Sequence, residues 1–495
     1  MHLSLLFVSA AHAGSLDRLD VGGAYGTPTG TNPAATWWNP AALGAGRGHR
    51  LLLDVAPTLG GITAARDNPD YGALDPAQFP NDGFPTEYDY SGTDRLGFVG
   101  VLPFLGVASD LGVDGLGLGL SLAVPHALGG ALDDPNGANR FANRQASLIH
   151  VYTSLAAAYQ VADKVSFGVA GHLVNSQAKI DTDTTILPDL AVGVRDILGD
   201  DEVSPQYQDG LAETPGYGTT TIFDLKGVGF TFGGGVHITP LDDEQLAISL
   251  SYNHGLRVQN KGSLDYQFEC PPAYDEQSNA AVAELGTCNT AALGEGTLGY
   301  RLPSRIHLGV AVSPVQRLRL ELMGAAVFWS AYRDLEITTS VSPDEFDVPR
   351  INAQEAAKLA TQDRLWARDG RDTFWVGLDA KGAISDLITV GGRVTYDRAA
   401  IQTQAVSANN YDASGVILAG LLDVTPAAPV SLSLSFAHTV LAPRTVTDSP
   451  FGVSVEQDAF APRYSYPSNN GTYTGSIDRL ALSVRVRLGA ASDDD

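Results

Sequence analysis

The chain has 495 residues and carries 56 acidic against 31 basic side chains, for a net charge of −25. This negative charge argues against a nucleic-acid partner, because nucleic-acid binding depends on Lys and Arg meeting phosphates. Mean hydropathy is −0.01, and the sequence contains no run of about twenty apolar residues, which excludes a membrane protein built from helices.

Residues 1–13, MHLSLLFVSAAHA, predict an atypical and possibly truncated signal peptide. An apolar centre ends in Ala11-His12-Ala13, the small-x-small pattern that a signal peptidase cuts after, but the positive n-region is missing. A buried N-terminal strand is the alternative. Residues 14–48 follow without a period of two or of 3.6, so we expect an irregular segment that packs inside something larger.

Most of the remaining chain, residues 49–488, alternates apolar and polar side chains. In residues 480–488, LALSVRVRL, every second side chain is apolar, and residues 245–253 and 430–437 repeat the pattern. Such strands have one apolar and one polar face, which is typical of an antiparallel barrel with lipid outside and a polar lumen. We count about fourteen strands, the even number that bacterial barrels use; their predicted centres are Leu53, Val99, Leu120, Thr153, Val169, Phe230, Leu250, Leu308, Leu322, Leu378, Val390, Leu418, Leu434 and Val484.

The predicted connections alternate in length. Tight turns are expected at residues 109–114, 162–164, 241–244, 313–316, 385–386 and 425–429, and long acidic loops at 182–221, 269–295 and 342–371. Long loops outside and both termini in the periplasm follow from this asymmetry. The acidic residues are read as solvated loop side chains, with a specific ion site as the alternative. Residues 489–495 are expected to form an acidic periplasmic tail.

Cys270 and Cys288 are the only cysteines, and both lie in one predicted loop. A disulfide between them would fit an oxidising compartment, although two unrelated thiols remain open. The spacing of Cys and His matches no metal site, and we expect no metal and no cofactor. No hydrolase elbow, phosphate loop or other catalytic motif occurs, so an enzyme is not expected.

The segment Ala35-Thr36-Trp37-Trp38-Asn39-Pro40-Ala41-Ala42-Leu43 resembles the N-terminal plug of the FadL/TodX family of outer-membrane transporters, which carries an Asn-Pro-Ala signature. The likeness continues in residues 155–180, 245–266 and 302–337. It implies a 14-stranded barrel plugged by a hatch (residues 14–48). Trp37, Trp38, Asn39, Pro40 and Ala41 would form the hatch element; read alone, Asn39-Pro40 would be an ordinary surface turn.

The family implies capture of long-chain fatty acids or other hydrophobic compounds by outer loops, a lumen pocket above the hatch, and sideways release at a kink in the third strand. We place that lateral opening at Pro125, His126, Gly129 and Gly130, because proline cannot donate to a strand ladder. The alternative is that the strand ends at Val124 and Pro125 begins a loop.

A fatty acid needs a cation for its carboxylate, and the candidates are Lys179, Arg364, Arg368 and Arg371. Surface arginines without this role are the alternative. Five histidines, His150, His172, His237, His254 and His307, are expected to face the lumen or the interface rather than to bind metal.

The expected location is the outer membrane of a Gram-negative cell, as a monomer, with outer-membrane lipid, lipopolysaccharide and the barrel-assembly machinery as partners. The last strand is expected to stop at Leu488 without the usual terminal aromatic residue, so assembly would use another signal. A general porin for small solutes and a barrel-scaffold surface enzyme or adhesin are the alternative functions.

Overall fold

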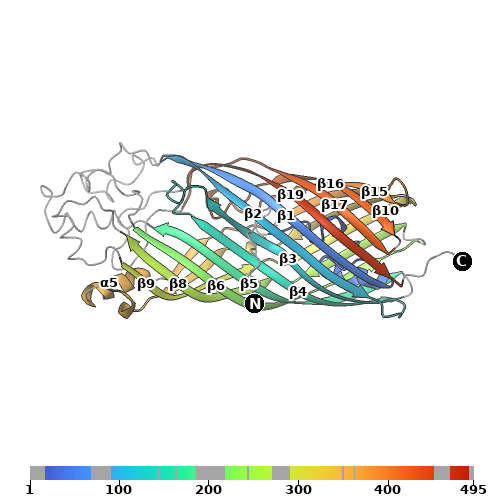
Figure 1. The fold of residues 1–495 in the computed structure, drawn as a ribbon, viewed down its shortest axis with the longest axis horizontal. Coiled ribbons are helices and arrows are strands. Elements are labelled where there is room, and N and C mark those ends of the chain that lie inside the picture. The colour runs from blue at the N-terminus through green and yellow to red at the C-terminus, as the bar shows by residue number, and fades with distance from the viewer. Residues whose placement is uncertain are drawn as a thin grey trace.

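In the computed structural model, the described residues are 17–68, 91–142, 144–161, 164–184, 218–241, 245–269, 290–347, 350–361, 363–427, 429–450 and 469–489. They form an elongated β-barrel whose strands run obliquely to its long axis (Figure 1). No helix in these ranges is long and apolar enough to cross a membrane.

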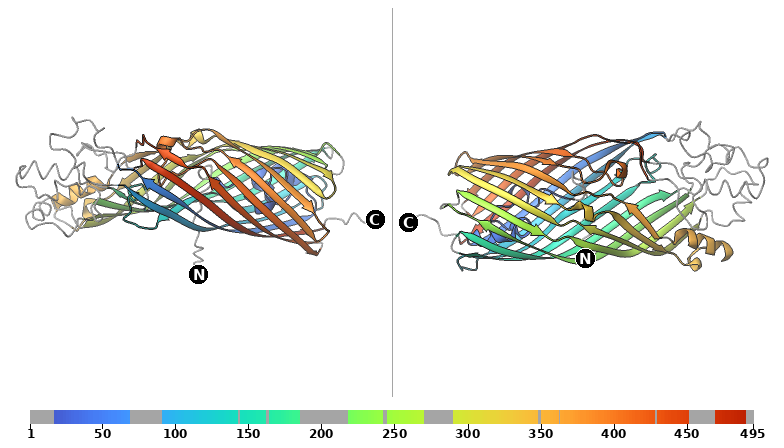
Figure 2. Two further views of the ribbon diagram at one scale, coloured as in Figure 1. Left: turned by 90° about the horizontal axis from the view of Figure 1, so that it is seen from above. Right: turned by 180° about the vertical axis from the view of Figure 1, so that it is seen from behind.

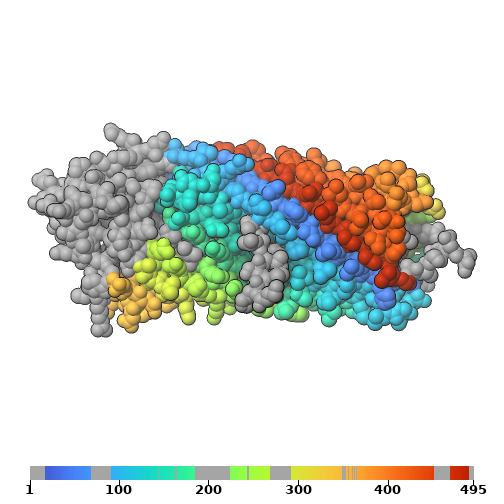
Figure 3. All heavy atoms as spheres, in the orientation of Figure 1, coloured from blue at the N-terminus to red at the C-terminus, as the bar shows by residue number. Residues whose placement is uncertain are grey.

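The wall is a closed antiparallel barrel of 14 strands, as predicted. It closes where β1 pairs with β19, from His49↔Leu488 to Arg66↔Gly471, so the beginning and the end of the wall lie side by side (Figure 3). The nine strands that cross without interruption are β1 (His49–Arg66), β2 (Gly92–Ser109), β3 (Leu116–Leu132), β4 (Gln145–Val161), β5 (Val165–Thr184), β6 (Gly218–Ile238), β15 (Ile388–Asp397), β16 (Gly415–Ala427) and β19 (Gly471–Leu488).

Five further wall strands are each interrupted once, which is why the sheet has 19 segments. Each interruption leaves two segments in sequence, and their pairing partners show that they continue one another around the wall. The five pairs are β7 (Leu246–Asn253) with β8 (Leu256–Glu269), β9 (Thr290–Leu302) with β10 (Arg305–Val315), β11 (Leu318–Val327) with β12 (Asp334–Ser340), β13 (Asp363–Ala367) with β14 (Thr373–Ala383), and β17 (Val430–Leu441) with β18 (Arg444–Val446).

Side chains alternate across the wall as the sequence predicts. On β17, Leu432, Leu434 and Phe436 are exposed outward, whereas Ser431 and Ser433 are buried towards the lumen. Successive side chains of a strand point to opposite faces, so one period-two pattern serves lipid and lumen together. Lipid tails stabilise the outward residues, since removing apolar surface from water contributes about 25 cal/mol per Å².

The two ends of the barrel differ. Tight turns such as Asp110 to Gly115 gather at one end, and the helix α5 (Arg350–Ala360) lies at the opposite end, called the loop end below (Figure 1). The prediction of one long acidic loop over residues 342–371 is wrong, because this stretch contains α5 and β13. The acidic composition concealed an alanine-rich segment that buries Ala353, Ala356 and Ala357 at helical spacing.

The N-terminal segment from Asp17 to Gly48 lies inside the barrel, towards the tight-turn end (Figure 2). It contains η1 (Gly23–Tyr25), the single-turn helix α1 (Ala35–Trp38) and the 3₁₀ helix η2 (Pro40–Ala45). The other short helices are η6 (Trp329–Ala331), η7 (Pro343–Glu345) and η8 (Thr403–Ala405). A core cluster of buried apolar side chains joins this segment to the inner wall.

Candidate functional site: the lumen segment and the unpaired stretch of the third strand

The Asn-Pro-Ala element is buried and hydrogen-bonded to the wall. Asn39 accepts a hydrogen bond from the Ala41 N–H through Oδ1 at 3.1 Å and donates one from Nδ2 to the Val236 carbonyl at 3.0 Å. Ser251 and Asn253 donate to the carbonyls of the two preceding tryptophans at 2.5 and 2.9 Å. Asn39 therefore caps η2 and ties it to β6, so it does not lie in a surface turn.

Trp37 and Trp38 fill the lumen beside this element. Trp37 packs edge-on against Tyr152, with ring centroids 5.4 Å apart, and Trp38 packs edge-on against Trp375 at 5.9 Å. The Trp38 indole N–H donates to the Val21 carbonyl at 2.8 Å. The Trp38 indole thus combines a large apolar contact with a satisfied polar group, as is usual for a buried tryptophan.

Glycines in the wall let the lumen segment approach the sheet. A Cβ on Gly168 would lie 2.5 Å from the carbonyl carbon of Pro40, and one on Gly117 would lie 2.6 Å from the Gly44 nitrogen. Gly235 faces Asn39 in the same way. Backbone-to-backbone packing of η2 on β3, β5 and β6 is therefore possible only where side chains are missing.

Charged wall residues hold the segment towards the tight-turn end. Lys381 donates to the Ala24 carbonyl at 2.7 Å and Arg393 to the Gly26 carbonyl at 3.2 Å. In the turn after β2, Asp110 accepts from the backbone N–H groups of Gly112 and Gly48 at 2.9 and 2.7 Å. These hydrogen bonds lower the pKa of Asp110 below its ordinary value.

The third wall strand does not end at Pro125. β3 continues to Leu132, which rules out the alternative that the strand stops at Val124. Its pairing with β4 slips between Ala123 and His126, so Val124 and Pro125 form a bulge. All residues from Ala123 to Ala127 are buried, and the usual alternation lapses there. A proline-containing bulge bends a strand, as expected for a residue without an N–H donor.

β3 also separates from β2 beside this bulge. The two strands pair at Leu96↔Leu132 and Gly97↔Ala131, and again from Phe104↔Ala123 to the tight turn. Between these stretches, residues 98–103 and 124–130 form no ladder pairs with each other, although every one of them is described. Gly129 and Gly130 lie in this unpaired stretch, together with Pro125 and His126.

The lumen segment covers the bulge from within. The Arg18 N–H donates to the Pro125 carbonyl at 2.9 Å, and the Arg18 guanidinium donates to the Val124 carbonyl at 2.9 Å. Asp17 forms an ion pair with Arg305 at 3.0 Å and lies 2.8 Å from Nδ1 of His126, and all three side chains are almost fully buried. Backbone groups that β2 leaves unpaired thus find partners in the lumen segment, as buried polar groups must.

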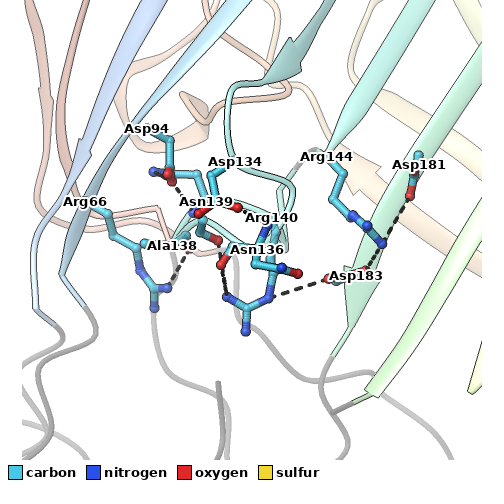
Figure 4. A network of polar contacts seen from close by, with 11 residues as sticks. Arg66, Asp94, Asp134, Asn136, Ala138, Asn139, Arg140, Arg144, Asp181 and Asp183 are labelled. Carbon is cyan, nitrogen blue, oxygen red and sulfur yellow. Dashed lines mark hydrogen bonds and ion pairs between the residues drawn. The ribbon is translucent and has the colours of Figure 1, made fainter. Parts of the chain in front are cut away.

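A polar network closes the outer end of the unpaired stretch (Figure 4). The connection between β3 and β4 places Asn139 over the wall, where its Nδ2 donates to Asp94 of β2 at 2.9 Å and to the Ala64 carbonyl of β1 at 3.1 Å. On the other side, Arg144 contacts Asp183 of β5 at 3.1 Å. The unpaired stretch between β2 and β3 is therefore bounded at one end by this network and at the other by the resumed pairing at Phe104↔Ala123.

The four cation candidates are not brought together. Lys179 is exposed on the outward face of β5, and Arg371 is exposed. Arg364 lies in β13, opposite Ile337, but its side chain is outside the described structure. Arg368 is buried 6.0 Å from the Trp366 ring, and its guanidinium donates to Asn409 O and Oδ1 at 3.1 and 3.2 Å. Its Nε is buried and has no hydrogen-bond partner among the described residues.

Other predicted residues fall in different places. His150, His172, His237 and His307 are buried on the inner face, whereas His254 is exposed. Cys270, Cys288 and residues 1–16 lie outside the described residues. Within the described ranges, no group of three or more His, Cys, Asp or Glu side chains could hold a metal ion.

Sequence reasoning missed Asp17 and Arg305. Neither residue stands in a motif, and 288 positions separate them. The available signal is weak: Arg305 begins a predicted strand two positions after Pro303, and Asp17 lies near the start of the irregular segment.

Comparison with known proteins identifies the class. A family model for outer membrane protein transport proteins (OMPP1/FadL/TodX) matches residues 14–409. The chain belongs to this family and is a β-barrel of the outer membrane. A search of curated proteins gives no match.

Solved structures share the fold. A Pseudomonas aeruginosa FadL homologue is similar with a TM-score of 0.68 and 16% identity, over 98% of this chain and 100% of that chain. The Ralstonia pickettii toluene transporter TbuX has a TM-score of 0.57 and 16% identity, over 92% and 94%. The Pseudomonas putida toluene transporter TodX has a TM-score of 0.58 and 14% identity, over 92% of this chain and 94% of that chain.

Proposed function

We propose that this protein carries hydrophobic molecules passively across the outer membrane, and that they leave the lumen sideways between β2 and β3. The observation that supports the proposal is the unpaired stretch, residues 98–103 of β2 and 124–130 of β3, where two neighbouring wall strands do not pair. Family membership supports a hydrophobic cargo, because the family's structural neighbours are named as transporters of such compounds.

Sideways exit agrees with the physical chemistry of the cargo. An apolar molecule loses about 25 cal/mol for each Å² that it exposes to water, so a route from lumen to lipid is more favourable than one through the periplasm. The lumen segment occupies the other route, since its Asn39 element is fixed against β5, β6 and β7. Residues 17–48 would thus act as the hatch, with ligand caught by the outer loops and held above it.

For cargo with a carboxylate, we propose Arg368 as its partner. The guanidinium is buried beside Trp366, and its Nε is available among the described atoms. Cations that hold carboxylates in apolar pockets in this way form charge-assisted hydrogen bonds. Arg371 is exposed and three positions away, and serves as the comparison residue.

Restoring a regular third strand tests the exit route. We expect the triple variant Pro125→Val, Gly129→Val, Gly130→Val to keep heat-modifiable gel mobility and to lose uptake of a labelled fatty acid into proteoliposomes. Gly420→Val is the control, since a Cβ at Gly420 meets nothing within 4 Å. Uptake by the triple variant at the control rate would show that cargo leaves elsewhere.

The carboxylate partner has its own test. Arg368→Gln should weaken binding of a long-chain fatty acid by about tenfold to a hundredfold, the usual range for a hydrogen bond to a charged group. Binding of a hydrocarbon of the same length should not change, and Arg371→Gln should change neither. Equal losses for both ligands would mean that Arg368 supports the fold rather than the carboxylate.

A further inference from the structure

Four cations lie together on the outward face of the wall, on three neighbouring strands. Lys226 of β6 stands directly opposite Lys261 of β8, and Arg257 of β8 stands directly opposite Arg301 of β9. All four side chains are exposed. We call these residues the basic patch; β6, β8 and β9 run side by side towards the loop end of the barrel (Figure 1).

The arrangement is unfavourable for the protein alone. Residues directly opposite each other on antiparallel strands have Cβ atoms about 5 Å apart, and like charges in such pairs are destabilising. Two like-charge pairs, four positions apart along β8, are unexpected in a chain with only 31 basic residues and a net charge of −25. An anion between the pairs would remove the repulsion.

Exposed acids border the patch on the same face. Glu336 contacts Arg257 at 3.2 Å, Asp224 stands two positions from Lys226 on β6, and Glu295 stands opposite Ser263, two positions from Lys261. None of these acids stands directly opposite a cation of the patch, so the direct cross-strand neighbour within each pair is still a like charge.

The patch lies at the height where membrane phosphates are expected. On the outward face of β6, Lys226 is followed towards the tight-turn end by Val228 and Phe230, which are 70% and 68% exposed. Arg301 is likewise followed by Ile306 and Leu308. The cations thus border the apolar band on the loop side, where the outer leaflet of an outer membrane presents lipid phosphates.

We propose that the basic patch is a binding site for the lipid A phosphates of lipopolysaccharide. Phosphate oxygens accept charge-assisted hydrogen bonds from Lys and Arg, and a planar guanidinium can bind two of them at once. The acyl chains of the same molecule would lie against Val228 and Phe230. This site is separate from the lumen and the transport route, so it stands whether or not the proposed exit is correct.

The test compares two double variants of the full-length protein in nonionic detergent. Lys261→Gln with Arg301→Gln removes one cation from each like-charge pair. Lys164→Gln with Arg317→Gln is the matched control, because it removes the same two residue types from exposed positions at the tight-turn end. Native mass spectrometry with purified lipid A measures the affinity of each variant for lipid A. A thermal melt with and without lipid A measures the stability of each variant.

We expect the patch variant to bind lipid A about thirtyfold more weakly than the wild type, and the control to bind as the wild type does. Without lipid A, the patch variant should melt at the same or a higher temperature, since repulsion has been removed. With lipid A, the wild type should gain more stability than the variant. Equal binding by the wild type and the patch variant would overturn the site. Binding of dephosphorylated lipid A by the wild type as tightly as intact lipid A would also overturn the site. Binding of inorganic pyrophosphate as tightly as lipid A would overturn lipopolysaccharide as the occupant.

Discussion

Replacing Gly168 with valine should unseat the lumen segment. A Cβ at this position would lie 2.5 Å from the Pro40 carbonyl carbon, whereas ordinary contacts begin at 3.4 Å, so η2 has to retreat by the difference of 0.9 Å. Asn39 donates to Val236 on the neighbouring strand at 3.0 Å, and this bond would lengthen beyond hydrogen-bonding range. The loss of this hydrogen bond and the overpacking together should lower the free energy that holds the lumen segment against the wall by about 2–4 kcal/mol.

Ion conductance in planar bilayers measures the result. The wild type should be closed or nearly so, and Gly168→Val should show steady leak currents while retaining heat-modifiable gel mobility. Gly420→Val, which adds the same side chain on β16 with open space around it, should conduct like the wild type. A well-folded Gly168→Val protein with wild-type conductance would refute the view that glycine contacts seat this segment.

Three further outcomes are expected. The lowered pKa of Asp110 means that its hydrogen bonds to Gly112 and Gly48 stabilise the protein fully above the ordinary value of 3.8, and that this stabilisation is lost as the pH falls through the lower folded-state pKa. Asp110→Asn should therefore be less stable than the wild type at pH 6, by less than about 1 kcal/mol in the free energy of unfolding, and the difference should shrink as the pH falls below 3.8. Asp17→Asn leaves the buried Arg305 without its carboxylate partner, so a denaturant titration should show a free energy of unfolding lower by about 3–5 kcal/mol. The double variant Asp17→Asn, Arg305→Gln should recover part of this loss. If the losses of the two single variants simply add, the two residues do not stabilise each other. Asn139→Ala should weaken the contacts that bound the unpaired stretch, and amide hydrogen exchange in residues 131–132 should become faster than in β16. Unchanged exchange would contradict a stabilising role for this network.

The wall was predictable because its pattern has one physical cause. Period-two alternation on β17 and β19 reports lipid on one side and lumen on the other, and every predicted strand centre falls in a wall strand. The pattern could not reveal the interruptions, since a break such as His254-Gly255 keeps polar and small residues that also occur in regular strands.

The site was only partly predictable. Pro125 marks the bulge because a missing N–H has a local consequence, and Asn39-Pro40-Ala41 has a recognisable signature. Arg368, named only as one of four candidates, differs from Arg371 by burial, which depends on Asn409 in a distant connection. Pairs such as Asp17 and Arg305 arise from tertiary contact alone and leave no periodic trace.

The docking surface of η2 consists of β3 to β6, which directly follow β1 and β2 in the chain, while the seam is sealed by β19 at the far end. The lumen segment can therefore pack against the early strands while the sheet is still open. Later strands then bring Arg393 and Arg479 around its free side. With this order of assembly, the lumen segment never has to enter a barrel that is already closed.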